Sequence, residues 1–166
     1  MSDFPIDPEL DLVLTREVDV PRDLVWAAWT RPEHLKHWFV PRPWTIAECE
    51  VDLRPGGAFR TVMCGPDGER HDNRGCYLEV RAPERLVWTD ALLPGFRPAG
   101  EPGGCGLGCF MTAIISLEAL GPERTRYTAV ALHNDAAGRR RHEEMGFMEG
   151  WGTCLDQLVA YMKQQR

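Results

Sequence analysis

The sequence predicts an α+β domain in which a curved antiparallel sheet of about seven strands wraps one long C-terminal helix, with two short helices beside it and a cavity between sheet and helix. Three observations support this prediction. Short segments of alternating apolar and polar residues follow one another between turn residues, which is typical of an antiparallel meander. Two short segments with helical spacing follow the first strand. One long amphipathic segment ends the chain, and it alone is long enough to cover the sheet.

The first part of the chain predicts one strand followed by two short helices. Apolar and polar residues alternate over residues 12–20, which is the period of a half-buried strand. Pro21 then fits the first turn of a helix, and the apolar residues after it recur at helical spacing. Residues 33–38 form a second helical segment, which two prolines end. Residues 1–10 show neither period, so we expect an irregular N-terminal arm.

The middle of the chain predicts six consecutive strands and one long loop. The alternating segments, separated by turn residues, are residues 45–53, 58–64, 75–81, 85–93, 110–120 and 125–133. Residues 94–108 are rich in glycine and proline, and we expect them to form a mobile lid over the mouth of the cavity.

The C-terminal segment, residues 139–163, predicts one long amphipathic helix. Its apolar stripe, at steps of three or four residues, is Met148, Trp151, Leu155, Leu158 and Met162. Glycine inside a helix is unfavourable by about 1 kcal/mol relative to alanine. The glycines at 146, 150 and 152 therefore indicate close approach of a ligand or another backbone, or else a kink near Gly150.

The composition narrows the class of protein. The length of 166 residues suits one domain, which we expect to span residues 1–166. A net charge of −6 argues against binding to nucleic acids or anionic lipids, because both need a basic surface. The N-terminus does not resemble a signal peptide, and no apolar run approaches the length of about 18 residues that a membrane span needs. We therefore expect a cytoplasmic protein that does not cross a membrane.

The cysteines predict thiols instead of disulfides or a metal site. There are six of them, and without a secretory signal a disulfide framework is not expected. Only Cys105 and Cys109 lie close together in the sequence, and zinc sites usually need a second pair of ligands. We expect neither a metal nor a cofactor.

Arg16 is the charged residue whose predicted position is least expected. It lies on the same face of the first strand as the apolar residues, so its guanidinium is predicted to point inward. Burying an unpaired charge is costly, which calls for a carboxylate partner. Glu149 on the last helix is one candidate and Glu50 is another. A structural ion pair is the favoured interpretation, and recognition of an anion or carbonyl group in the cavity is the alternative.

Aromatic and apolar residues predict the lining of the cavity. The chain has six tryptophans, and aromatic side chains with a few polar groups commonly line small-molecule pockets. For Trp29, packing in the core is the favoured interpretation. The residues predicted to line the cavity are Arg16, Tyr77, Trp88, Met111, Phe147, Glu149, Trp151 and Leu155.

Few residues favour catalysis. The sequence has no G-x-S-x-G motif, and its only serines are Ser2 and Ser116. His142 and Glu143, at the start of the last helix, are possible acid–base residues near the mouth. The histidines at 34 and 37 could touch, although a solvated helix face is favoured. No catalytic residue is assigned, and whether the protein is an enzyme stays open.

Several short motifs resemble those of a known superfamily. They are residues 20–26 (VPRDLVW), 29–35 (WTRPEHL), 52–57 (DLRPGG), 75–79 (GCYLE), 83–87 (PERLV) and 146–151 (GFMEGW). In this order, over residues 10–163, they resemble the START-like (SRPBCC) helix-grip superfamily. The closest resemblance is to the branch homologous to the activator of the 90-kDa heat-shock protein's ATPase, which includes small self-contained members.

The resemblance implies a helix-grip fold and three candidate functions. The eukaryotic activator has a second, N-terminal domain that contributes to chaperone binding, and this chain has no room for it. Small members bind hydrophobic ligands, and one protects its producer from an enediyne antibiotic. We therefore expect a monomer or homodimer that binds an apolar or aromatic small molecule, for sequestration, carriage or protection. The alternatives are an enzyme such as a cyclase, hydrolase or isomerase in the same cavity, and a chaperone co-factor by analogy with the family.

Overall fold

The computed structural model describes residues 5–102 and 108–165. The chain begins with strand β1 (Asp11–Val18), followed by helices α1 (Arg22–Thr30) and α2 (Pro32–Trp38). The remaining strands are β2 (Thr45–Val51), β3 (Ala58–Cys64), β4 (Arg70–Arg81), β5 (Arg85–Thr89), β6 (Leu92–Leu93), β7 (Arg97–Pro98), β8 (Met111–Gly121) and β9 (Arg124–His133). Two helices, α3 (Ala136–Glu144) and α4 (Phe147–Gln164), end the chain.

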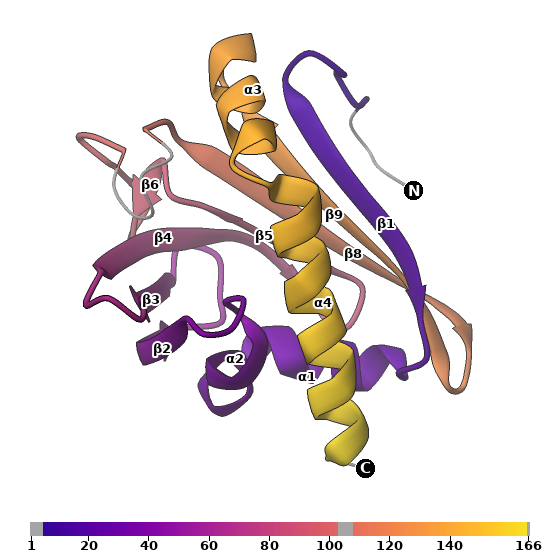
Figure 1. Cartoon of the computed structure of the whole chain (residues 1–166). Coiled ribbons are helices and arrows are strands. Elements are labelled where there is room, and N and C mark those ends of the chain that lie inside the picture. Colours follow the sequence, from indigo (N-terminus) through magenta and orange to yellow (C-terminus); the bar gives the residue numbers. More distant parts are fainter. Residues whose placement is uncertain (1–4, 103–107, 166) are drawn as a thin grey trace.

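Seven of the strands form one antiparallel sheet, which confirms the predicted fold class. Their order is β1-β9-β8-β5-β4-β3-β2. Strands β2 to β5 therefore pair in chain order, β5 pairs with β8 and β8 with β9, and the first strand, β1, pairs with the last, β9. Figure 1 shows the sheet curving around α4, with α1 and α2 near the C-terminal end of that helix. None of the helices in the described ranges is long and apolar enough to cross a lipid bilayer.

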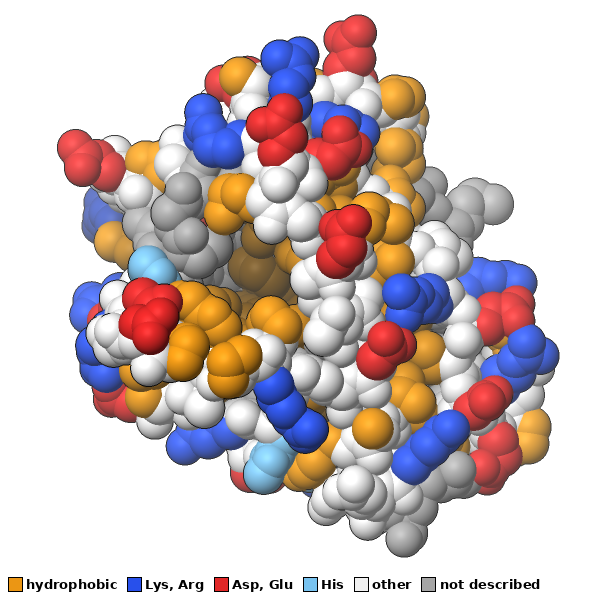
Figure 2. Space-filling view, viewed as in Figure 1, with side chains coloured by type: hydrophobic (Ala, Val, Ile, Leu, Met, Phe, Trp, Pro, Cys, Tyr) orange, Lys and Arg blue, Asp and Glu red, His pale blue; other side chains and the backbone are white. Residues whose placement is uncertain are grey.

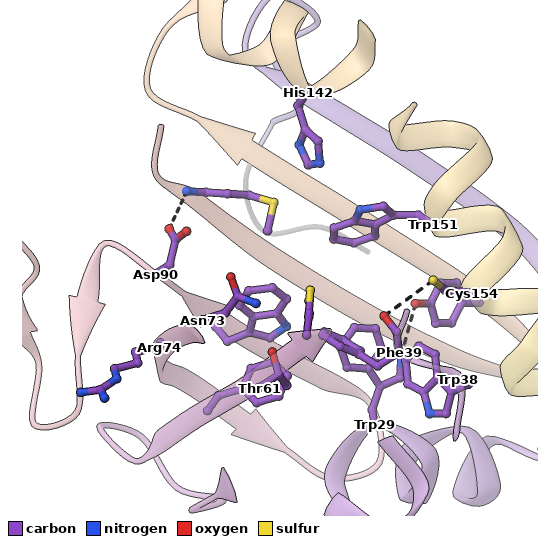
Figure 3. Close-up of a pocket in the computed structure, with 16 residues that line it drawn as sticks. Trp29, Trp38, Phe39, Thr61, Asn73, Arg74, Asp90, His142, Trp151 and Cys154 are labelled. Carbon is purple, nitrogen blue, oxygen red and sulfur yellow. Dashed lines mark hydrogen bonds between the residues drawn. The ribbon is translucent and has the colours of Figure 1, made fainter. Parts of the chain in front are cut away.

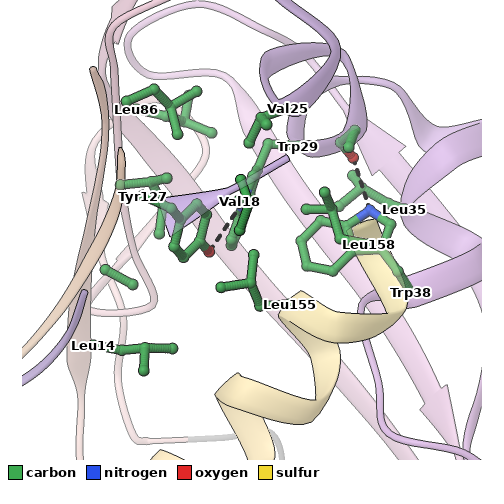
Figure 4. Close-up of a cluster of buried hydrophobic side chains, with 14 of the residues drawn as sticks. Leu14, Val18, Val25, Trp29, Leu35, Trp38, Leu86, Tyr127, Leu155 and Leu158 are labelled. Atoms are coloured by element: carbon green, nitrogen blue, oxygen red, sulfur yellow. Dashed lines mark hydrogen bonds between the residues drawn. The ribbon is translucent and has the colours of Figure 1, made fainter. Parts of the chain in front are cut away.

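The core lies between the sheet and α4. Leu155, Leu158 and Met162 are fully buried on the helix, as the stripe predicted. Figure 4 shows Leu155 and Leu158 facing Tyr127 of the sheet and the tryptophans of α1 and α2. Met148 departs from the predicted stripe because it is 45% exposed, and the neighbouring Phe147 is buried in its place. The ring of Phe147 packs against those of His142 and Trp151.

The C-terminal segment is two helices instead of the predicted one. Asp135 caps α3 by accepting a hydrogen bond of 2.7 Å from the backbone N–H of Gly138. The helix ends at Glu144, and Gly146 follows with a φ of +93°, in the left-handed region. A side chain rarely adopts that conformation, so glycine here permits the break between the helices. The break lies at this glycine instead of the predicted kink near Gly150, which lies inside the regular helix α4.

Two other boundaries differ from the prediction. Strand β4 begins at Arg70, five residues before the predicted start, because its polar first half pairs with β3 through ion pairs such as Arg60–Asp72 at 2.9 Å. The predicted strand over residues 85–93 ends at Thr89, and β6 pairs with β7 in a separate small ribbon. Only β7 of this ribbon lies within the predicted lid, since β6 falls in the last residues of the predicted strand. Residues 103–107 of the lid, including Cys105, lie outside the described residues.

Candidate functional site

A pocket of about 170 Å³ lies between the sheet and the two C-terminal helices. Figure 2 shows a hollow beside α4 with hydrophobic side chains at its floor. The pocket follows from the fold because a curved sheet and a straight helix separate toward one end. Its aromatic lining residues are Trp29, Trp38, Phe39, Phe59, Trp88, Tyr127 and Trp151.

The aromatic rings of the pocket hold one another in place. The ring of Phe59 packs edge-on against Trp88 at 5.1 Å and against Phe39 at 5.6 Å, measured between centroids. On the opposite wall, Trp151 of α4 lies 4.8 Å from Phe147. The indole of Trp29 donates a 3.2 Å hydrogen bond to the hydroxyl of Tyr127. A wall of interlocked rings offers a preformed surface for an apolar or aromatic molecule.

One hydrogen-bond donor on this wall has no partner. The indole nitrogen Nε1 of Trp88 is buried and makes no hydrogen bond to any residue that the structure describes. An unsatisfied buried donor costs about 1–3 kcal/mol. A ligand oxygen or a water molecule that reaches the Trp88 N–H would remove this cost.

The imidazole of His142 is the second polar group of the pocket. Its Nδ1 lies 2.9 Å from Nε2 of His133, and Nδ1 of His133 lies 2.8 Å from the carbonyl oxygen of Leu10. Burial, and to a lesser extent the nearby His133, lowers the pKa of His142 to about 4. His142 is therefore neutral at neutral pH.

Two further ionisable groups line the pocket. Asp90 accepts a 2.8 Å hydrogen bond from the backbone N–H of Met111, and burial raises its pKa although backbone hydrogen bonds oppose the shift. The thiol of Cys154 donates to the carbonyl oxygen of Phe39 over 3.7 Å, and burial raises its pKa to about 12. Cys154 is thus a protonated thiol at neutral pH and not an activated nucleophile.

The structure brings three of the predicted lining residues together at the pocket. Trp88 of β5, Met111 of β8 and Trp151 of α4 all line it. Tyr77, Phe147 and Leu155 are buried in the adjoining core and do not line it. Two charged residues complete the predicted set. Glu149 is exposed on α4, and Arg16 lies outside the pocket.

The predicted partner of Arg16 is wrong. Its guanidinium pairs with Asp156 at 2.9 Å, and the two side chains are 41% and 74% exposed. The side chain does point to the helix side of the sheet, but β1 is an edge strand, so the guanidinium emerges beside α4 instead of entering the core. It passes over Gly152, where a Cβ atom would lie 2.6 Å from Nη2 of Arg16. The glycine in this helix accommodates a neighbouring side chain.

Sequence patterns missed most of the sheet side of the pocket. Thr61, Asn73 and Asp90 line it, and none of them was predicted. The alternation of β3 could have placed Thr61 on the inner face, since it shares a parity with Phe59. His142 was considered only with Glu143, which is exposed; its actual partner, His133, ends the preceding strand. No local period connects a strand end to the next helix.

The histidines at 34 and 37, for which a solvated helix face is the favoured prediction, both contact Tyr161 of α4. Nδ1 of His34 lies 2.9 Å from the hydroxyl of Tyr161, and His37 stacks on the same ring at 4.5 Å. These contacts of His34 and His37 with Tyr161 link α2 to α4 on the outside of the molecule. Within the described ranges, no three His, Cys, Asp or Glu side chains are grouped so that they could hold a metal ion.

Solved structures share the fold over nearly the whole chain. A protein from Nitrosomonas europaea is 53% identical, with a TM-score of 0.89 over 96% of this chain and 98% of that chain. One from Arthrobacter aurescens is 25% identical, with a TM-score of 0.76 over 94% and 87% of the two chains. An AHSA1 protein from Silicibacter pomeroyi, 21% identical, has a TM-score of 0.68 over 94% and 99%, and supports the fold alone.

None of the curated proteins matches this sequence. The family model described as "Activator of Hsp90 ATPase homolog 1-like protein" matches residues 19–163, which is most of the chain. The helix-grip architecture and the solved relatives agree with that match. The chain therefore belongs to the Activator of Hsp90 ATPase homolog 1-like family, in the AHSA-type branch of the START-like (SRPBCC) superfamily that its motifs predicted.

Proposed function

We propose that this protein binds a small, largely apolar aromatic molecule in the pocket between the sheet and α4. The supporting observation is the combination of an aromatic lining with the unpartnered indole N–H of Trp88. A buried donor without a partner is rare in a folded protein, and a ligand oxygen is one group that satisfies it. The family, in general, includes ligand-binding and co-chaperone proteins, which is compatible with this role.

The size of the pocket limits the ligand. Its volume of about 170 Å³ is close to that of an engineered protein cavity of about 150 Å³ that takes up benzene. One or two fused aromatic rings therefore fit without rearrangement, and a larger molecule would extend through the opening seen in Figure 2. Carriage or sequestration needs only this binding step.

Calorimetric titration with 2-naphthol, a soluble two-ring probe, tests the proposal. We expect saturable 1:1 binding, and we expect Trp151→Ala to weaken it about tenfold because the variant loses an aromatic wall. Trp44→Ala is the matched control, since Trp44 stacks on His71 away from the pocket and its loss is expected to leave binding unchanged. Absence of binding, or equal loss in both variants, would contradict the proposal.

A further inference from the structure

One lining residue of the pocket, His142, belongs to a histidine pair that nothing in the family resemblance calls for. His133 ends β9 and His142 lies in the last turn of α3, so the β9–α3 connection brings the two rings together. Their centroids are 5.1 Å apart and the rings are nearly perpendicular. His142 is also edge-on to Phe147 at 5.2 Å and to Trp151 at 6.2 Å. The His142 ring is therefore held on three sides.

The hydrogen bonds of this pair determine where its protons lie. The carbonyl oxygen of Leu10 can only accept, so Nδ1 of His133 must donate to it. For an uncharged His133, one ring nitrogen donates and the other accepts, so Nε2 of His133 is left as an acceptor. The nitrogen that faces it, Nδ1 of His142, must then carry the proton. Nε2 of His142 is left with an unshared electron pair.

That electron pair belongs to a ring that lines the pocket. Figure 3 shows the His142 ring pointing from α3 into the space between Trp151 and Asp90. Nε2 of His142 makes no hydrogen bond to any side chain or backbone group in the described ranges. The group that satisfies it must carry a donor hydrogen, such as a hydroxyl.

The charges around the pocket disfavour an anionic ligand. Its charged lining residues in the described ranges are Arg74 and Asp90. Arg74 pairs with Asp72 at 3.3 Å and is 62% exposed, and Figure 3 shows it directed away from the other labelled side chains. A ligand carboxylate would therefore meet an aspartate and an imidazole lone pair, while Arg74, the one cationic lining residue in the described ranges, is paired with Asp72 and directed away.

From this arrangement we infer that His142 is the acceptor by which the pocket recognises a hydroxyl group, and that the ligand is an uncharged hydroxylated aromatic molecule. His133 is a positioning residue, because it holds the tautomer of His142 without lining the pocket itself. The inference rests on the proposed function and deepens it by naming the ligand class.

Three matched probes test this inference at about neutral pH: 2-naphthol, 2-methoxynaphthalene and 2-naphthoate. They share two rings and differ in one group that donates, only accepts or is anionic. We expect 2-naphthol to bind about tenfold more tightly than the methoxy compound, the equivalent of one buried hydrogen bond, and the carboxylate to bind most weakly.

The variant His142→Phe keeps an aromatic ring and removes the acceptor. We expect it to bind 2-naphthol and 2-methoxynaphthalene equally, whereas His37→Phe, an exposed histidine outside the pocket, is expected to keep the tenfold preference. The ¹⁵N shifts of the imidazole nitrogens in the wild-type protein are an independent measurement, and they are expected to show protonation of His142 at Nδ1 alone. This measurement does not depend on a variant that folds.

The possible failures are distinguishable. If all three probes bind equally, or if the carboxylate binds best, the proposed pocket function stands and the hydroxyl inference is overturned. If His142 proves to carry its proton on Nε2, the acceptor role is also overturned. If no probe binds at all, both the proposed function and the inference fall together.

Discussion

Lowering the pH from about 7 to about 4.5 is expected to destabilise the folded chain through His142. Burial lowers the pKa of this histidine from 6.5 to about 4, so below pH 6.5 the unfolded chain binds a proton that the folded chain does not accept. Stability attributable to His142 is therefore complete above pH 6.5 and falls as the pH drops toward 4. For these two pKa values, proton linkage gives a loss of about 2 kcal/mol over this pH interval.

Urea unfolding at both pH values, followed by tryptophan emission, measures this loss. Other groups titrate in the same interval, so the relevant quantity is the difference between the wild type and His142→Phe, which has no proton to bind. We expect the wild type to lose about 2 kcal/mol more than this variant on acidification. His37→Phe is the control and is expected to follow the wild type. Identical pH dependence in the wild type and His142→Phe would refute the assignment of a buried, neutral histidine at this position.

Three further substitutions test the packing, and one double-mutant cycle tests the surface ion pair. Leu155→Ala removes a fully buried side chain of α4 and is expected to lower the free energy of unfolding by about 2–5 kcal/mol in a urea titration. Gly57→Ala would place a Cβ atom 1.9 Å from a backbone oxygen and is expected to cost about 3 kcal/mol, whereas Gly152→Ala meets only the flexible end of Arg16 and is expected to stay within about 1 kcal/mol of wild type. A double-mutant cycle between Arg16 and Asp156 is expected to give a coupling below about 1 kcal/mol, because both side chains are largely exposed.

For the leucine, for Gly57 and for the ion pair, one outcome would contradict the prediction. Met148→Ala, on the exposed side of the same helix, is the control for the leucine, and equal losses in the two would mean that α4 is rotated from its described position. A stable Gly57→Ala protein would show that the turn before β3 can rearrange. A coupling of several kcal/mol for the arginine pair would indicate that the pair is buried in solution.

The sequence by itself determined the fold class. Period-two alternation is a local property of a strand and helical spacing a local property of a helix, so both are visible without tertiary information. The same periods predicted the buried stripe of α4, including Leu155, Leu158 and Met162, and suggested Trp88 and Trp151 for the lining. Family motifs in the predicted order agreed with this fold, and the family match confirmed the affiliation.

Tertiary structure decided the contacts between elements. Alternation gives the side of the sheet on which Arg16 lies, but only strand order makes β1 an edge and sends the guanidinium out to Asp156. The backbone conformation of Gly146 divides the predicted terminal helix into α3 and α4. The pairing of His133 with His142 depends on how α3 docks beside the end of β9, and with it the proton on each nitrogen. These features rest on the relative positions of elements, and position in space is not encoded in any local period.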